Sequence, residues 1–180
     1  MRRAGAGRTR GRARPVRLVD DPVLRTRCEP VTAFDENLGA LVDDMMATMA
    51  GAGGVGLAAN QVGVLWRVFV YSCPDGSGTR RSGHVINPVL TVDDPHRTVD
   101  DVPEGCLSLP EVHGRLARPA HAVVTGRDRH GAPVTVDGTG LLARCLVHEV
   151  DHLDGVLYFD HLSRLARARL LRSYASTGRS

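Results

Sequence analysis

Apolar residues recur at spacings of three and four in three stretches of the chain, and this period predicts three amphipathic helices. The first covers residues 35–50, where Asp35 precedes the first apolar position and is a suitable N-cap. The second covers residues 139–153 and ends before Gly155. The third covers residues 162–174, with leucines along one face and arginines around the rest.

Between the first two helices, runs rich in β-branched residues predict strands. Turns that contain Pro, Asp or Gly separate four such runs, which cover residues 64–71, 85–92, 120–127 and 132–136. Residues 104–110 are short and partly apolar and are assigned to neither type. A helix, several strands and two further helices are an order typical of the α+β class. We therefore expect antiparallel β-sheets wrapped around the second helix, with a C-terminal helix outside them.

The positive charge of the chain is concentrated at its N-terminus. All 23 basic residues are arginine, and seven of them lie in the first 17 residues, which contain no acid. Beyond residue 17 acids outnumber arginines, which excludes a strongly basic nucleic-acid-binding domain. The absence of lysine excludes a Schiff-base or P-loop lysine. We expect residues 1–16 to be a disordered extension, rather than an organellar transit peptide, and residues 17–180 to be a single domain.

The expected cellular compartment follows from two further features. No run approaches the ~20 apolar residues of a membrane-spanning helix, and no secretory signal is visible. The four cysteines form no Cys-x-x-Cys pair. Reduced thiols in a cytoplasmic protein without membrane contact fit this pattern better than a disulfide framework.

The predicted second helix carries the most specific candidate chemistry. Its HEVDH sequence places His148 and His152 four residues apart on one face, where both imidazoles reach one metal ion. Glu149 is rotated off that line and is suited to act on a water molecule at the metal. The histidines share their face with Leu141 and Cys145, so buried structural histidines are the alternative interpretation.

A catalytic metal site needs a third protein ligand besides two histidines. Asp154 and Asp160 follow the helix too closely, and His161 lacks the glycine-containing spacing of the metzincins. Cys106 is the better candidate, because polar and small residues surround it in EGCLS, a segment that packing does not explain. We interpret the other three cysteines as small buried apolar residues, with Cys145 also a candidate pocket wall.

Three separated blocks of the sequence match motifs of one protein family. GVGLAANQ (54–61) looks like a GxGLAAxQ block, EGCLS (104–108) matches a second block, and HEVDH (148–152) matches HExDH. With these blocks in order, residues 16–172 resemble peptide deformylase, of the shorter bacterial type. The family comprises metal hydrolases that remove the N-formyl group from the N-terminal formyl-methionine of new polypeptides, releasing formate. The resemblance implies an α+β fold with antiparallel sheets around the HExxH helix.

The resemblance also implies the metal site. It makes Cys106, His148 and His152 the ligands of one divalent ion and Glu149 the acid and base. One thiolate and two imidazoles accept Zn²⁺, Fe²⁺, Ni²⁺ or Co²⁺, so the ligand types leave the metal open. The resemblance favours Fe²⁺.

The remaining implied roles concern the substrate, an N-formyl-Met nascent peptide. Gln61 and the backbone N–H of Leu107 would hold the formyl oxygen. The peptide would lie along the chain as an added strand, with the methionine side chain in an apolar pocket. Besides His148, the residues implied in binding or lining are Gly54, Val55, Gly56, Gly105, Leu141 and Cys145.

The chain departs from the commonest family pattern at three positions. Asn60 stands where proline is frequent, and Val147 stands where glutamine is frequent. Neither change removes a catalytic group. His113 stands where several relatives carry an arginine that meets the peptide, so the resemblance does not say how residues beyond the methionine are held.

Two other functions compete with this interpretation. A zinc endopeptidase of the HExxH type needs a downstream third ligand and a longer substrate groove, and neither is visible. A ribosome- or RNA-binding module would use the Arg-rich leader and the last helix, which carries Arg164, Arg167, Arg169 and Arg172. Solvation is the simpler explanation of that helix, although a deformylase making weak contact with the ribosome would use the same arginines.

Overall fold

The computed structural model describes residues 11–92 and 98–178. Its helices are α1 (Glu36–Gly51), α2 (Gly140–Leu153) and α3 (Arg164–Ser176), with short 3-10 turns η1 (Pro22–Arg25), η2 (Ala59–Val62) and η3 (Tyr158–His161). Its strands are β1 (Gly56–Ala58), β2 (Val68–Pro74), β3 (Arg80–Thr91), β4 (Thr98–Cys106), β5 (Leu109–Pro119), β6 (His121–Arg127) and β7 (Pro133–Thr139). Among the described residues, no helix is long and apolar enough to cross a membrane.

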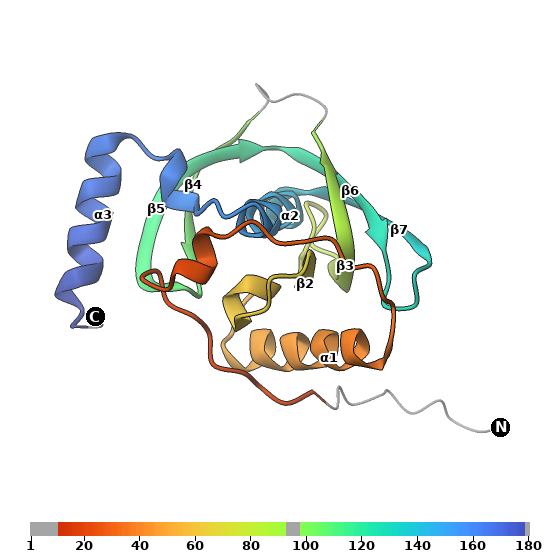
Figure 1. Cartoon of the computed structure of the whole chain (residues 1–180). Helices are drawn as coiled ribbons and strands as arrows, with labels where there is room; N and C mark the ends of the chain where they lie inside the picture. The colour runs from red at the N-terminus through yellow and green to blue at the C-terminus, as the bar shows by residue number, and fades with distance from the viewer. Residues whose placement is uncertain (1–10, 93–97, 179–180) are drawn as a thin grey trace.

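The expected α+β architecture is confirmed. Five strands form an antiparallel sheet in the order β1-β2-β3-β6-β7, and β4 and β5 form a separate two-stranded sheet. The strands curve around α2, which runs through the middle of the molecule (Figure 1). On the inner side of the large sheet, Phe69, Val85 and Val124 pack with Leu142 and Leu146 of α2.

The strand β2 lies between two helices. Its residues Phe69 and Tyr71 share a core cluster with α2, whereas Val68 and Val70 belong to a second cluster with α1. Successive side chains of a strand point to opposite faces, so both faces of β2 are buried. This double burial explains why β2 is apolar at consecutive positions instead of alternating.

The three predicted helices are confirmed to within about two residues at each end, the usual uncertainty of helix boundaries. Asp35 caps α1 as expected, since its carboxylate accepts a hydrogen bond from the backbone N–H of Leu38 at 3.1 Å. Gly155 follows α2 in the left-handed region, with φ of 76°.

The strand prediction is less complete. The four expected strands exist, but the first begins at Val68 rather than residue 64, and the second extends back to Arg80. The strands β1, β4 and β5 were not expected. β1 has only three residues, and the β4–β5 hairpin carries many polar and proline residues, so neither shows a clear alternation.

The β4–β5 hairpin brings the EGCLS segment to the end of α2. Cys106 pairs with Leu109 across a tight turn made by Leu107 and Ser108. Val112 and Leu116 of β5 belong to a core cluster with residues of η3 and α3. The C-terminal helix α3 lies outside the hairpin that carries Cys106 and supports this hairpin (Figure 1).

The N-terminal segment differs from the expectation. Residues 11–16 lie along α1, where the backbone N–H of Arg12 donates to Asp44 at 2.7 Å and that of Arg14 donates to Thr48 at 2.9 Å. The Arg14 guanidinium also pairs with Asp44 at 2.9 Å. Asp44 and Thr48 of α1 thus bind Arg12 and Arg14, and the expected disorder of residues 11–16 is wrong. The rest of that prediction, for residues 1–10, lies outside the described residues.

Candidate metal centre and active site

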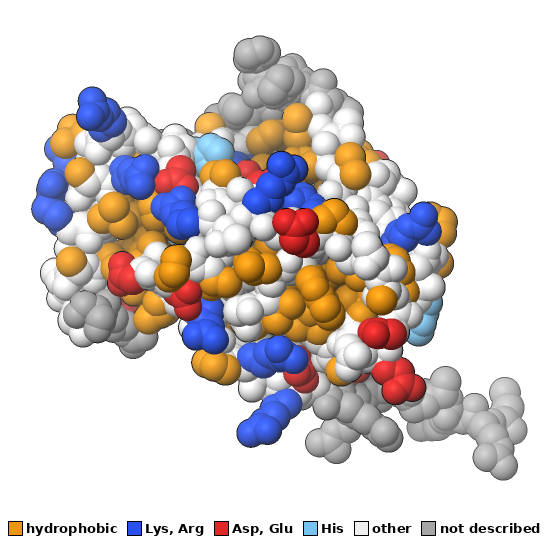
Figure 2. Space-filling model, in the orientation of Figure 1, with side chains coloured by type: hydrophobic (Ala, Val, Ile, Leu, Met, Phe, Trp, Pro, Cys, Tyr) orange, Lys and Arg blue, Asp and Glu red, His pale blue; other side chains and the backbone are white. Residues whose placement is uncertain are grey.

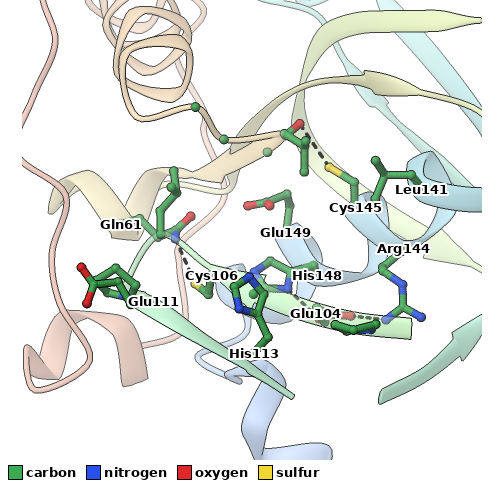
Figure 3. Close-up of a pocket in the computed structure, with 18 residues that line it drawn as sticks. Gln61, Glu104, Cys106, Glu111, His113, Leu141, Arg144, Cys145, His148 and Glu149 are labelled. Carbon is green, nitrogen blue, oxygen red and sulfur yellow. Dashed lines mark hydrogen bonds and ion pairs between the residues drawn. The ribbon is translucent and has the colours of Figure 1, made fainter. Parts of the chain in front are cut away.

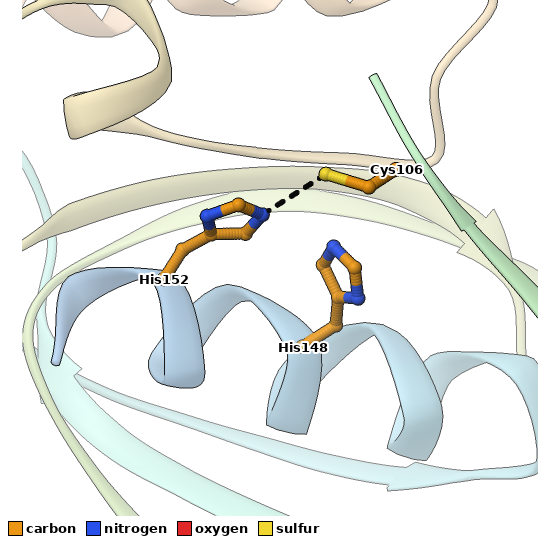
Figure 4. A group of neighbouring side chains, drawn as sticks. All are labelled: Cys106, His148 and His152. Carbon is orange, nitrogen blue, oxygen red and sulfur yellow. Dashed lines mark hydrogen bonds between the residues drawn. The ribbon is translucent and has the colours of Figure 1, made fainter. Parts of the chain in front are cut away.

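Three candidate ligands meet above α2 (Figure 4). Cys106 is the last residue of β4, and His148 and His152 lie on successive turns of α2. Their ligand atoms all lie within 4.8 Å of one another, and the Cys106 sulfur is 3.2 Å from His152 Nε2. Both histidines are buried. One thiolate and two imidazoles in this arrangement are able to hold a metal ion.

The surroundings of Cys106 favour the form that binds metal. Burial raises the pKa of this thiol, but His152 and His148 beside it outweigh burial and hold the pKa well below its usual value. The thiolate is the form of cysteine that coordinates metals. The donor set therefore fits a divalent ion in its charge state as well as in its geometry.

Glu104 orients one of the histidines. Its carboxylate lies 2.7 Å from His148 Nδ1, which leaves Nε2 to face Cys106. Glu104 is itself buried and accepts hydrogen bonds from Arg118 at 2.7 and 3.1 Å and from Arg144 at 2.7 Å. Although burial raises the pKa of Glu104, the His148 and Arg118 partners hold it below the usual range. This arrangement matches the carboxylate partner that metal-ligating histidines commonly have.

The Glu104 network was missed in the sequence, although two signals for it exist. Arg118 follows Val112, Gly114 and Leu116 at alternate positions of β5, on the face that packs inward. Arg144 lies on the buried helix α2. An arginine at an inward position is almost never buried unless paired, so it indicates a carboxylate nearby.

Glu149 stands beside the candidate metal site. Burial raises the pKa of its carboxyl group to about 7. Its Oε2 atom is buried and has no hydrogen-bond partner among the described residues. A buried carboxylate without a protein partner is suited to exchange a proton with a bound molecule.

Gln61 is held with its amide nitrogen toward Cys106. Its Oε1 accepts a hydrogen bond from the backbone N–H of Ala58 at 2.8 Å. The opposite end, Nε2, lies 3.1 Å from Ser108 Oγ and 3.5 Å from Cys106 Sγ. The donor therefore points to the place where the three candidate ligands meet.

These groups open into one cavity of about 380 Å³ (Figure 3). Every residue predicted to bind or line the substrate site contributes to its wall, together with the predicted catalytic residues; His152 is not in the lining. The lining residues among the predicted ones are Gly54, Val55, Gly56, Gln61, Gly105, Cys106, Leu107, Leu141, Cys145, His148 and Glu149.

The backbone at Gly56 lies close to two side chains of α2. A Cβ atom there would lie 2.3 Å from Glu149 Oε1 and 2.7 Å from Cys145 Sγ. A side chain at this position would displace the Glu149 carboxylate and the Cys145 sulfur, whereas glycine leaves both in place. This contact gives a physical reason for the second glycine of GVGLAANQ.

The three residues that depart from the common family pattern lie in different parts of the structure. Asn60 is buried and donates from Nδ2 to the His152 backbone carbonyl at 2.5 Å, which ties η2 to the end of α2. Val147 packs with Ala122 and Ala143, in a core cluster on the other side of α2. His113 lines the cavity, with its ring against Gly105 (Figure 3).

The downstream residues considered as third ligands have other partners. Asp154 pairs with Arg67 at 2.7 Å, and Asp160 pairs with Arg25. His161 lies 2.9 Å from Asp151. None of the three belongs to the Cys106 group.

Replacing Glu104 by glutamine should weaken metal binding about 10- to 100-fold, as is typical when the partner of a ligating histidine is lost. The neutral amide also leaves Arg144 buried without its Glu104 countercharge and leaves Arg118 with Asp151 alone, so the unfolding temperature should fall. Metal titration and thermal unfolding measure the two effects. Asp137→Asn, at an exposed pair with His121, is the matched control and should change neither. Wild-type metal affinity in Glu104→Gln would contradict the orienting role.

Known proteins resemble this chain in sequence over most of its length. The family model "Polypeptide deformylase" matches residues 13–168. Peptide deformylase 1 of Streptomyces avermitilis is 53% identical over 175 residues, covering 96% of this chain and 81% of the relative. Peptide deformylase 2 of Streptomyces coelicolor is 51% identical and covers 97% of both chains.

Solved structures agree with these relatives. A peptide deformylase from Legionella pneumophila superposes with a TM-score of 0.81 at 38% identity, covering 92% of this chain and 95% of that one. A peptide deformylase from Ehrlichia chaffeensis in complex with actinonin superposes with a TM-score of 0.85 at 34% identity, covering 94% and 99% of the two chains.

Proposed function

Because the chain belongs to the polypeptide deformylase family, it removes the N-formyl group from nascent polypeptides, and we propose how its own residues do so. The family is metal-dependent, and the reaction is hydrolysis of the amide that joins the formyl group to the terminal nitrogen. The observation that carries the proposal is the meeting of Cys106, His148 and His152 beside Glu149 in one cavity.

We propose that Cys106, His148 and His152 hold the metal ion and that the ion is Fe²⁺. The lowered pKa of Cys106 and the orientation of His148 by Glu104 support the ligand set. When bound, a divalent ion supplies a Lewis acid and lowers the pKa of a water molecule toward ~7. The choice of iron rests on the family resemblance, since these ligand types also accept Zn²⁺, Ni²⁺ and Co²⁺.

Glu149 moves the proton in this proposal. Its carboxylate accepts a proton from the water that attacks the formyl carbon, and it then delivers that proton to the departing amine nitrogen. The unpartnered Oε2 supports this role, because no protein group competes for the proton. A pKa of about 7 suits a group that must both accept and donate near neutral pH.

Gln61 and Leu107 hold the formyl oxygen as negative charge develops on it. The contact from Ala58 fixes the orientation of the Gln61 amide and keeps its Nε2 donor beside Cys106. The backbone N–H of Leu107 is the second donor. Each such donor is worth roughly 2.7–4 kcal/mol of transition-state stabilisation.

The backbone groups of Val55, Gly56 and Gly105 hold the peptide, and Gly54 keeps the approach to β1 open. Recognition through main-chain hydrogen bonds tolerates many sequences, which suits an enzyme that acts on many N-termini. The methionine side chain enters a pocket whose wall is formed by Leu141, Cys145 and His148. All of these residues line the cavity, which supports the assignment.

Formate release from formyl-Met-Ala-Ser tests the metal and the site together. Protein loaded anaerobically with Fe²⁺ should turn over, and its activity should fall on exposure to air as iron and its thiolate ligand oxidise. Ni²⁺-loaded protein is the matched control, because it should turn over without this loss. A protein that binds either metal and releases no formate would contradict the proposed site.

We also propose a weak contact with the ribosome in the cytoplasm, through arginines of α3. Arg167 is partly engaged, since it pairs with Asp160 at 3.1 Å and lies over the Phe159 ring. Figure 2 shows further basic side chains on the surface around α3. Nascent chains emerge at the ribosome, so such a contact would raise the local substrate concentration.

Changing Arg164, Arg167, Arg169 and Arg172 to glutamine, with residues 1–16 deleted, should weaken co-sedimentation with ribosomes. The wild-type interaction should also decline steeply as the salt concentration rises, because phosphate contacts release counterions. Arg80 and Arg81 on β3 are exposed and provide the matched double substitution to glutamine, which should bind as wild type. Binding that is indifferent to salt and to the α3 changes would remove this proposal.

A further inference from the structure

Two cysteines outside the metal site lie close to the cavity, one in its wall and one in the core behind it. Cys145 lines the cavity from α2, and Cys73 lies behind it on β2. Both are free thiols, buried in the same core cluster. The mechanism above uses neither sulfur as a reactive group, and packing alone would be served by any small apolar residue.

Backbone contacts bring the Cys145 sulfur to β2. The Val55 carbonyl oxygen lies 3.5 Å from Cys145 Sγ and also accepts the backbone N–H of Ser72 at 2.8 Å. Ser72 directly precedes Cys73 on the strand. Cys73 and Cys145 belong to one core cluster and each shifts the pKa of the other, so the two sulfurs are neighbours across the interface of β2 with α2.

The interaction between the two thiols also makes them chemically unequal. It lowers the pKa of Cys73 and, together with burial, raises the pKa of Cys145. The thiolate is the nucleophilic form, so a shared proton leaves one sulfur of the pair ready to react. Cys28 differs in this respect, because burial raises its pKa to about 11 and no other cysteine acts on it.

We infer that Cys73 and Cys145 form an oxidisable dithiol site, at which a peroxide joins the two sulfurs in a disulfide. One sulfur attacks the O–O bond, which leaves a sulfenic acid on that cysteine and releases one water. The second sulfur then displaces the sulfenic oxygen, which leaves as a second water with the remaining thiol proton. The pair loses two electrons and two protons, and peroxide gains them.

Oxidation of the pair should affect the substrate site, because Cys145 lines the cavity. Cys145 lies beside Glu149, since both would contact a Cβ atom at Gly56. A bond to Cys73 draws the Cys145 sulfur toward β2, away from the wall against which the substrate packs. We expect turnover of formyl peptides to fall on oxidation and to return with a dithiol reductant.

The test uses the zinc-loaded enzyme, because zinc has no redox chemistry of its own and occupies Cys106. After treatment with hydrogen peroxide and unfolding, titratable thiols should fall from the four of the sequence to two. Trypsin cleaves after arginine and leaves each cysteine in its own peptide. The non-reduced digest should therefore contain residues 68–80 linked to residues 145–164.

Cys73→Ser should remove the linked peptide, whereas Cys28→Ser, the matched buried control, should retain it. Retention of all four thiols in the wild-type enzyme, or a linkage between any other two cysteine peptides, would overturn the inference. The wild-type digest decides the question even where a variant fails to fold. Linked enzyme with unchanged turnover would overturn the expected effect on the site.

Discussion

An enzyme with Glu149 replaced by glutamine is expected to lose about 10²- to 10⁴-fold in kcat, the usual contribution of a positioned general acid or base. Glutamine has nearly the same size and cannot accept the proton from the attacking water. The proposed metal ligands and Gln61 are unchanged, so metal content should stay at the wild-type level. Formate release and metal analysis on the same preparation measure the two quantities.

The stability of Glu149→Gln provides a further check. The wild-type carboxylate is buried with Oε2 unpartnered, and burial of an unpaired charge is unfavourable. The variant should therefore unfold at the same temperature as wild type or higher, which separates a chemical effect from misfolding. Glu36→Gln, on the exposed first turn of α1, is the control and should alter neither rate nor metal. A kcat within about tenfold of wild type would remove Glu149 from the proton transfer.

The second large effect is expected from Cys106→Ser. The substitution replaces a thiolate ligand by a neutral hydroxyl, while His148 and His152 remain. Loss of the hydrogen-bond partner of a metal ligand lowers metal affinity about 10- to 100-fold. Loss of the ligand itself should therefore lower metal affinity by more than about 100-fold. Metal should be nearly absent after dialysis, and formate release should fall with it. Atomic absorption and activity measured on the same samples test both.

Cys28→Ser is the matched control for that experiment, because Cys28 is buried and lies outside the Cys106 group. It should bind metal as the wild type does. Full metal loading of Cys106→Ser would exclude Cys106 as a ligand and would reopen the position for another residue. Loss of metal in both variants would indicate general destabilisation instead.

The helices could be predicted because their apolar period is strong, and the histidines of α2 could be placed because residues four apart share a helix face. Cys106 could not be joined to them by local rules. It comes to α2 through the β4–β5 hairpin, whose sequence shows little alternation. Before the structure it was a candidate because of its polar and small neighbours in EGCLS and because of the motif resemblance, but neither placed it in space. Local pattern therefore placed two of the three candidate ligands, and long-range strand pairing placed the third beside them.

The Glu104 network shows the same limit. Glu104, Arg118 and Arg144 come from β4, β5 and α2, and no spacing in the sequence relates one to another. Only the fold brings the three charges together. The disorder predicted for residues 11–16 was wrong for a related reason. Their partner Asp44 lies on α1, and amino-acid composition gives no information about such a long-range contact.

The position of β2 between α1 and α2 has a consequence for how the molecule unfolds. The two core clusters share this strand, one on each of its faces. Detaching either helix exposes one apolar face of β2 and weakens the strand on whose other face the second helix packs. We therefore expect the domain to lose both layers in a single cooperative transition, with the backbone amides of β2 among the last to exchange with solvent.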